Sequence, residues 1–294
     1  MSRPGQNISS SDAVQSHPRI FEKNRYVYPV LSRRAKGISI GINLNPDRLC
    51  NFDCVYCQVD RTRPSPIQDV DREMIRRELK SLLADVRSGD LFRHPKFAGA
   101  PDGWKRLNDV AFSGDGEPTT YPGFQEIVRD VVGVLRKSGV GGAKLVLITN
   151  ASQLGRPDVR EALNLMDAAN GEVWAKLDAG TEEYYKTVCR TQVRFDAVIK
   201  NILETSLERP LVIQSCFMRL HGLGPDDAEI GAYIERLKEF IQGGGKIREV
   251  QVYTIARKPA ERFVSTLGDA EVDHIVGRVK GESALPATGY YSHP

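Results

Sequence analysis

Six short runs rich in β-branched and apolar residues alternate with longer segments of helical periodicity, and this alternation limits the fold more than any other feature. The apolar runs are Ser39–Leu44, Asp109–Ser113, Lys144–Thr149, Glu172–Asp178, Leu211–Met218 and Glu249–Ile255. The helical segments are Asp69–Val86, Gly123–Ser138, Pro157–Ala169, Arg194–Glu208, Ala228–Gln242 and Asp269–Lys280. Strands that alternate with helices of this length form a parallel sheet with right-handed crossovers. We therefore predict an α/β fold, and six units fit an incomplete barrel or a doubly wound sheet.

The domain organisation follows from composition along the chain. Hydrophobic residues make up 40% of the 294 residues and charged residues 27%, which is typical of a soluble globular enzyme. No linker separates a second hydrophobic core, so we predict one barrel domain over residues 37–282. We expect a disordered tail over residues 1–18, where no hydrophobic period is present, a basic N-terminal extension over 19–36 and a C-terminal tail over 283–294.

Charge excludes few partners. The chain has 41 basic and 38 acidic residues, a net charge of +3, so composition does not demand a nucleic-acid partner. In the basic extension, the pair Arg33 and Arg34 suits a carboxylate or phosphate, although a solvated segment over one end of the barrel fits equally well. No apolar run approaches the roughly 20 residues that cross a bilayer, and the start of the chain lacks an apolar signal region. We expect a cytoplasmic protein that binds no membrane.

Three of the five cysteines, Cys50, Cys54 and Cys57, follow the first predicted strand with the spacing C-x3-C-x2-C. Structural zinc sites usually have four protein ligands, and this loop offers three. A [4Fe-4S] cluster held by three cysteines leaves one iron free for an exchangeable ligand. We predict such a cluster here, with a zinc loop or three buried thiols as the alternatives. Cys216 is expected to be a small buried residue, and we assign no role to Cys189.

The cysteine loop, with Tyr56 directly before its third cysteine, resembles the cluster motif of the radical S-adenosylmethionine superfamily. The segment Ser113–Thr119, with the sequence Ser-Gly-Asp-Gly-Glu-Pro-Thr, resembles the glycine-rich turn of that superfamily. The resemblance implies a partial (β/α)6 TIM-type barrel of parallel strands that binds a [4Fe-4S] cluster and S-adenosyl-L-methionine. In that family the cluster cleaves the cosubstrate to a 5′-deoxyadenosyl radical, and a reductant protein such as flavodoxin or ferredoxin supplies the electron.

The same resemblance implies a set of site residues on loops and strand ends. Glycines let backbone approach a ligand, Glu117 is expected to bind the ammonium of the cosubstrate, and polar residues at the carboxyl ends of parallel strands face ligands. A lysine is costly to bury unpaired, so we expect the candidate catalytic residue Lys176 to meet an anion or Asp178. The implied cofactor-binding residues are Tyr56, Gly114, Gly116, Glu117, Asn150, Asp178, Gln214 and Tyr253.

Within the superfamily, residues 26–260 resemble the wyosine-synthase-related group, through segments such as Pro29–Arg34, Val173–Gly180 and Tyr253–Pro259. Enzymes of that group condense pyruvate with a methylated guanosine of tRNA and bind a second cluster through three additional N-terminal cysteines. This sequence has no cysteine before Cys50, so we carry over the cosubstrate site and not the tRNA reaction.

The function we predict is hydrogen abstraction from an unidentified substrate, either an anionic small molecule or an RNA. Two alternatives stay open: an iron-sulfur electron-transfer or binding protein without radical catalysis, and a tRNA-modifying wyosine-type synthase. A zinc-stabilised RNA-binding module would need a fourth ligand and a continuous basic face, and the sequence offers neither.

Overall fold

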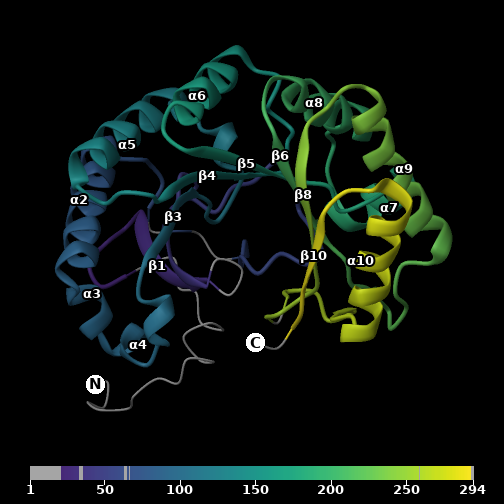
Figure 1. Cartoon of the computed structure of the whole chain (residues 1–294), viewed down its shortest axis with the longest axis horizontal. Helices are drawn as coiled ribbons and strands as arrows, with labels where there is room; N and C mark the ends of the chain where they lie inside the picture. The colour runs from purple at the N-terminus through teal and green to yellow at the C-terminus, as the bar shows by residue number, and fades with distance from the viewer. Residues whose placement is uncertain (1–20, 33–35, 63–64, 66, 258, 293–294) are drawn as a thin grey trace.

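The computed structural model describes residues 21–32, 36–62, 65, 67–257 and 259–292, and their centre is one curved eight-stranded sheet (Figure 1). Its strand order is β1-β2-β3-β4-β5-β6-β8-β10. Strand β1 pairs antiparallel with β2, and every other neighbouring pair is parallel. The strands are β1 (Val27–Ser32), β2 (Gly37–Ile42), β3 (Leu107–Phe112), β4 (Lys144–Thr149), β5 (Gly171–Lys176), β6 (Leu211–Cys216), β8 (Ile247–Tyr253) and β10 (Ala287–Tyr290), and β7 (Arg219–Leu220) pairs with β9 (Val264–Ser265) in a small second sheet.

Helices lie along the outside of the curved sheet, as Figure 1 shows for α2, α5, α6, α8, α9 and α10. Helix α5 illustrates why they pack there: Phe124, Ile127, Val128 and Val131 are all buried, and this spacing places them on one face of the helix. The α-helices are α2 (Arg72–Ser88), α3 (Asp90–Arg93), α4 (Pro95–Ala98), α5 (Phe124–Ser138), α6 (Pro157–Asp167), α7 (Glu182–Cys189), α8 (Phe195–Glu208), α9 (Asp227–Gln242) and α10 (Asp269–Ser283).

The partial parallel barrel predicted from the sequence is confirmed. Each of the six predicted strands and six predicted helices has a counterpart, with ends that differ by a few residues. Among the helices of the described residues, none is both long and apolar enough to cross a membrane.

The sheet extends beyond residues 37–282 at both ends. Strand β1 lies in the segment predicted only as a basic extension, and β10 lies in the predicted C-terminal tail. The β1 backbone is held from outside the sheet, because the buried Glu78 of α2 accepts hydrogen bonds from the amides of Arg25, Tyr26 and Val27 at 2.8–3.0 Å. The predicted tail over 1–18 and the pair Arg33 and Arg34 lie outside the described residues.

Candidate functional site

A cavity of about 590 Å³ lies where the cysteine loop, the turn after β3 and the carboxyl ends of several strands meet. This placement agrees with the general position of active sites in parallel barrels. Residues from the first to the last strand of the sheet contribute to its walls. The predicted site residues that line it are Cys50, Cys54, Tyr56, Cys57, Gly114, Gly116, Glu117, Asn150, Lys176, Asp178 and Tyr253.

Gln214 is the one predicted site residue that is not among the lining residues. It is paired in register with Lys176 on one side and Gln251 on the other, and its amide donates to the Gln251 Oε1 at 2.8 Å. Only 1% of Gln214 is exposed. It lies two residues before Cys216, which lines the cavity, so Gln214 packs beneath the cavity with its amide partnered inside the protein.

The cysteine loop, residues 50–57, places each thiol in different surroundings. The Cys50 Sγ accepts from the Phe52 amide at 3.5 Å, and burial raises the pKa of Cys50 to about 11. The Cys57 Sγ accepts from Arg61 Nη1 at 2.9 Å, while Arg61 Nη2 donates to the Asp115 carbonyl at 3.0 Å. Arg61 therefore ties the cysteine loop to the glycine-rich turn.

Cys54 contacts Cys189, for which the sequence indicated no role. A hydrogen bond between the two thiols lowers the pKa of Cys54 and raises the pKa of Cys189. The backbone holds them together, since the Asp53 amide donates to the Cys189 carbonyl at 3.2 Å and the Val55 amide to the Val188 carbonyl at 2.9 Å. All five cysteines of the chain line the same cavity.

The glycine-rich turn passes close to the start of the cysteine loop. A Cβ on Gly114 would overlap the Asn43 side chain, and one on Gly116 would overlap the Leu49 carbonyl. Asn43 holds this turn from the end of β2, because its Oδ1 accepts from the Asp115 amide at 3.1 Å and its Nδ2 donates to Asp115 Oδ2 at 2.7 Å. Both glycines are thus required by close backbone packing as well as by any ligand.

Glu117 is buried, with 3% of its surface exposed, and joins the ends of β3 and β4. Its Oε1 accepts from the Thr119 amide, the Thr119 hydroxyl and the Thr149 hydroxyl at 2.5–3.1 Å, and its Oε2 accepts from the Asn150 amide at 2.6 Å. Burial raises the pKa of Glu117 in spite of these bonds. The Oε2 atom, with one donor, keeps capacity for a second.

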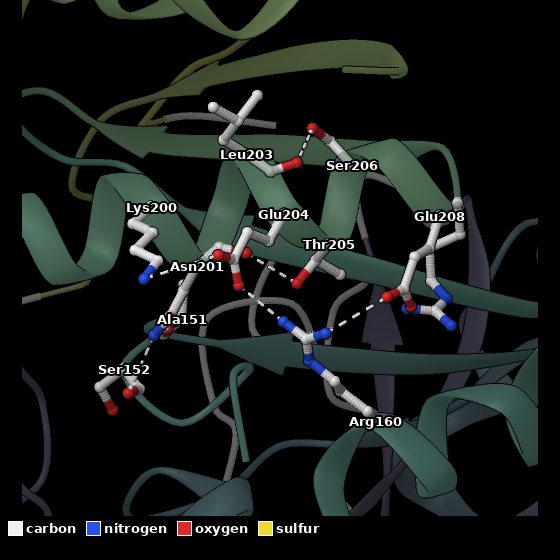
Figure 2. A network of polar contacts seen from close by, with 11 residues as sticks. Ala151, Ser152, Arg160, Lys200, Asn201, Leu203, Glu204, Thr205, Ser206 and Glu208 are labelled. Atoms are coloured by element: carbon white, nitrogen blue, oxygen red, sulfur yellow. Dashed lines mark hydrogen bonds and ion pairs between the residues drawn. The ribbon is translucent and has the colours of Figure 1, made fainter. Parts of the chain in front are cut away.

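Asn150 links the strand ends to the cysteine loop. Its Nδ2 donates to Asn51 Oδ1 at 2.8 Å, and Asn51 Nδ2 donates to the Ser152 hydroxyl at 2.7 Å. Figure 2 shows the support behind this turn: Asn201 of α8 donates to the carbonyls of Ala151 and Ser152 at 2.9 and 3.1 Å.

Lys176 meets Asp178, as the sequence predicted. The Lys176 Nζ lies 3.1 Å from Asp178 Oδ1 and donates to the Tyr253 hydroxyl; it also lies over the rings of Tyr56 and Tyr253 at 5.1 and 4.8 Å. Asp178 accepts further bonds from the Tyr56 hydroxyl at 2.6 Å and the Cys216 amide at 2.8 Å. Burial alone would lower the pKa of Lys176, but the Asp178 carboxylate raises it above its ordinary value. The ammonium is therefore charged.

Sequence reasoning missed several residues that shape the site. Asn43 directly follows β2, and the rule that polar strand ends face ligands would have found it. No such signal marks Arg61, Asn51 and Asn201. Each makes its hydrogen bond to a residue far away in the sequence, and the local sequence pattern does not indicate that partner.

Comparison with solved structures confirms, at the level of the fold, the predicted resemblance to radical S-adenosylmethionine enzymes. A structure of TYW1 with a lysine-pyruvate adduct bound has a TM-score of 0.53 and 16% identity, covering 86% of this chain and 75% of that one. SuiB of Streptococcus suis bound to S-adenosylmethionine has a TM-score of 0.54 and 13% identity, covering 88% and 49%. A spore photoproduct lyase mutant has a TM-score of 0.55 and 10% identity, covering 82% and 74%.

Curated relatives match at low identity. A UPF0026 protein of Methanocaldococcus jannaschii is 31% identical over 176 residues, which are 60% of this chain and 46% of that protein. A protein of Brachyspira hyodysenteriae named GTPase Obg is 24% identical over 260 residues, covering 86% of this chain and 33% of that protein. The sequence of this chain does not contain G-x-x-x-x-G-K-[ST], the phosphate-binding loop motif of P-loop nucleotide-binding proteins. The chain thus spans between a third and a half of the length of these relatives. No family model matches the chain.

Proposed function

We propose that this protein is an enzyme that holds a [4Fe-4S] cluster on Cys50, Cys54 and Cys57, binds S-adenosyl-L-methionine and abstracts hydrogen from a second substrate. The observation that carries the proposal is the meeting of the cysteine loop and the glycine-rich turn at one cavity, within a fold shared with radical S-adenosylmethionine enzymes. An electron carrier would need the thiols but has no use for a cavity of this size beside them.

The cysteine loop fits a four-iron cluster better than a single ion. In the described part of the chain, no group of three or more His, Cys, Asp or Glu side chains surrounds one ion position. In a cluster each thiolate binds a different iron, so the three ligands lie farther apart than they would around a single ion, and the three cysteines of the loop line the same cavity. The raised pKa of Cys50 means that binding releases its proton. A cluster held by these cysteines would supply the electron for cleavage of the cosubstrate and an iron with an open position for its methionine group.

The protein's own residues would bind and orient the cosubstrate around that loop. Glu117 Oε2 has capacity to accept from an ammonium, and the lack of side chains at Gly114 and Gly116 brings backbone to the cavity wall. Tyr56 is oriented by its bond to Asp178. A reductant protein such as flavodoxin or ferredoxin completes the proposal as electron donor.

The charge of Lys176 favours a second substrate that carries an anionic group. Lys176 lines the cavity, and its Nζ is held by Asp178, Tyr253 and the Tyr56 ring. A carboxylate or a phosphate docking at this rim would gain a charge-assisted hydrogen bond. The substrate classes proposed are therefore an anionic small molecule or an RNA.

Anaerobic reconstitution tests the function. We expect about four irons and about four sulfides per chain, and formation of 5′-deoxyadenosine on addition of S-adenosylmethionine and dithionite. Replacing Cys50, Cys54 and Cys57 by Ala should abolish both, whereas Cys216→Ala, a change at another cysteine of the same cavity, should leave the iron content unchanged. Zinc in place of iron, or full iron in the triple variant, would refute the cluster. A cluster that never yields 5′-deoxyadenosine would favour the electron-carrier alternative.

A further inference from the structure

Cys54 and Cys189 form a thiol pair, and the proposed function uses only Cys54 of the two. They are distant in sequence, yet their thiols hydrogen-bond to each other and both line the cavity. Two backbone hydrogen bonds, Asp53 to Cys189 and Val55 to Val188, hold the two segments side by side. Cys189 is the last residue of α7, so the end of that helix determines its position. The paired backbones bring the two cysteines to neighbouring positions, and such closeness is a condition for a disulfide.

The other two thiols of the cysteine loop have different partners. Cys57 accepts from the Arg61 guanidinium at 2.9 Å, and Cys50 accepts from the Phe52 amide at 3.5 Å. Within the described residues, Cys54 is therefore the loop cysteine whose partner is another thiol. The arrangement favours a link from Cys54 to Cys189 over a link within the loop.

We propose that Cys54 and Cys189 are a disulfide-forming modification site of the cluster-free protein, with a peroxide as oxidant. The Cys54 Sγ attacks a peroxide oxygen, the O–O bond breaks, and a sulfenic acid and one water result. The Cys189 Sγ then attacks the Cys54 Sγ, the S–S bond forms, and the hydroxyl leaves with the Cys189 proton as a second water. In total the two thiols lose two electrons and two protons, and hydrogen peroxide is reduced to two waters.

The disulfide would preserve a cluster ligand. A sulfenic acid without a neighbouring thiol goes on to sulfinic acid, which a dithiol does not reverse, whereas a disulfide is reversible. Cys189 thus keeps Cys54 in a recoverable state whenever the cluster is lost. This consequence rests on the proposed function; the formation of the disulfide does not.

Peptide mapping of the whole cluster-free chain after treatment with hydrogen peroxide tests the site. Trypsin leaves the three loop cysteines on one peptide, Leu49–Arg61, and Cys189 on Thr187–Arg190, so the link appears as a joined pair of peptides that fragmentation assigns to Cys54. Cys189→Ser should raise sulfinic acid at Cys54 on the order of tenfold, and the control Cys216→Ser should leave it at the wild-type level. Dithiothreitol should restore iron uptake by oxidised wild-type protein.

The outcomes separate the two proposals. The thiol-pair site would be overturned by a dominant link within the loop, by the absence of a link to Cys189, or by an equal effect of both serine variants. The first two outcomes are read from the peptide map of the wild-type protein, so they can be decided even if a variant fails to fold. A mapped Cys54–Cys189 link in a protein that takes up no iron when fully reduced would support the pair and refute the cluster.

Discussion

Lys176 keeps its charge in the protein interior because several neighbours share it. Its side chain is 16% exposed, and Asp178, at 3% exposure, neutralises it at 3.1 Å. The Tyr253 hydroxyl and two aromatic rings complete its surroundings. Breaking a buried pair from one side costs more than the pair contributes, because a charge is left without a partner. The Lys176 ammonium is therefore held at the cavity by groups of the protein itself.

Glu117→Gln should weaken S-adenosylmethionine binding to the reconstituted protein by about 10- to 100-fold, because one charge-assisted hydrogen bond contributes on the order of 1.5–3 kcal/mol. Equilibrium dialysis with labelled cosubstrate measures it. Thr149→Val is the matched control, since it removes one internal donor to Glu117 and leaves the carboxyl group in place. Equal affinity of the glutamine variant and the wild type would show that Glu117 only joins the strand ends.

Asp109, the third residue of β3, should make the free energy of unfolding fall as pH rises. Burial raises its pKa from 3.8 to about 6 despite a hydrogen bond from Ser39. A raised acid pKa means that the folded state holds the proton more tightly, so the contribution is fully present below about pH 4 and lost as pH passes 6, by up to about 3 kcal/mol.

Urea unfolding of wild type and Asp109→Asn from pH 4 to 7 measures this effect. The variant should lack the part of the decrease that Asp109 causes, and it should be the more stable protein at pH 7. The buried Glu117, whose pKa is also raised, contributes to both proteins and cancels in the difference. A constant difference across the range would disprove the assignment to Asp109.

At the scale of elements, the cysteine loop is positioned by segments that follow it in the sequence. The end of α7 pairs with its backbone near Cys54, and the turn after β4 holds it through Asn51. That turn includes Ala151 in the left-handed region, at φ 63°, a conformation that alanine adopts only when surrounding contacts require it. Helix α8 supplies those contacts through Asn201 (Figure 2).

Asn201→Ala should therefore destabilise the protein by about 1–3 kcal/mol, because two carbonyls lose their donor. It should also speed hydrogen exchange of the backbone amides in the cysteine loop, because Asn201 holds the turn after β4 and that turn holds the loop through Asn51. Urea unfolding and hydrogen exchange measure the two effects. Lys200→Ala, one residue earlier on α8 at an exposed ion pair with Glu204, should cost at most about 1 kcal/mol. Unchanged exchange in the loop would contradict a positioning role for α8.

At the scale of the whole molecule, the sheet is an open arc and not a closed barrel. Its edges are the antiparallel strand β1 and the short strand β10, which lie at the two ends of the arc in Figure 1. Residues near both edges, Leu31 of β1 and Tyr290 of β10, line the same cavity as the cysteine loop. One cavity therefore has walls from both halves of the sheet.

S-adenosylmethionine should accordingly stabilise the reconstituted protein as a unit. At a concentration of 100 times its Kd, a ligand specific for the native state adds about 2.7 kcal/mol, which corresponds to about 4–5 °C in Tm for a chain of this size, since the entropy of unfolding is about 2.1 cal/mol/K per residue. Differential scanning calorimetry without reductant measures the shift. Adenosine alone is the control and should give a smaller shift. No shift at saturating cosubstrate would count against cosubstrate binding in the cavity.

The sequence by itself determined the α/β class, the order of six strands and helices, and the candidate cysteine and glycine motifs. These are local properties: hydrophobic period sets which face a segment buries, and a turn needs its glycines wherever it is placed. It also indicated that Lys176 must find an anion, because the cost of burying a charge does not depend on the fold.

Only the tertiary structure decided which distant residues meet. The pairing of Cys54 with Cys189, the bond from Arg61 to the Asp115 carbonyl and the placement of Gln214 beneath the cavity depend on how the sheet curves and where α7 ends. Strand β1 likewise needed Glu78 of α2 to hold its start. Such contacts join segments that share no local sequence pattern. Their energies also depend on the exclusion of water by the folded core, so they cannot be predicted from any single stretch of the sequence.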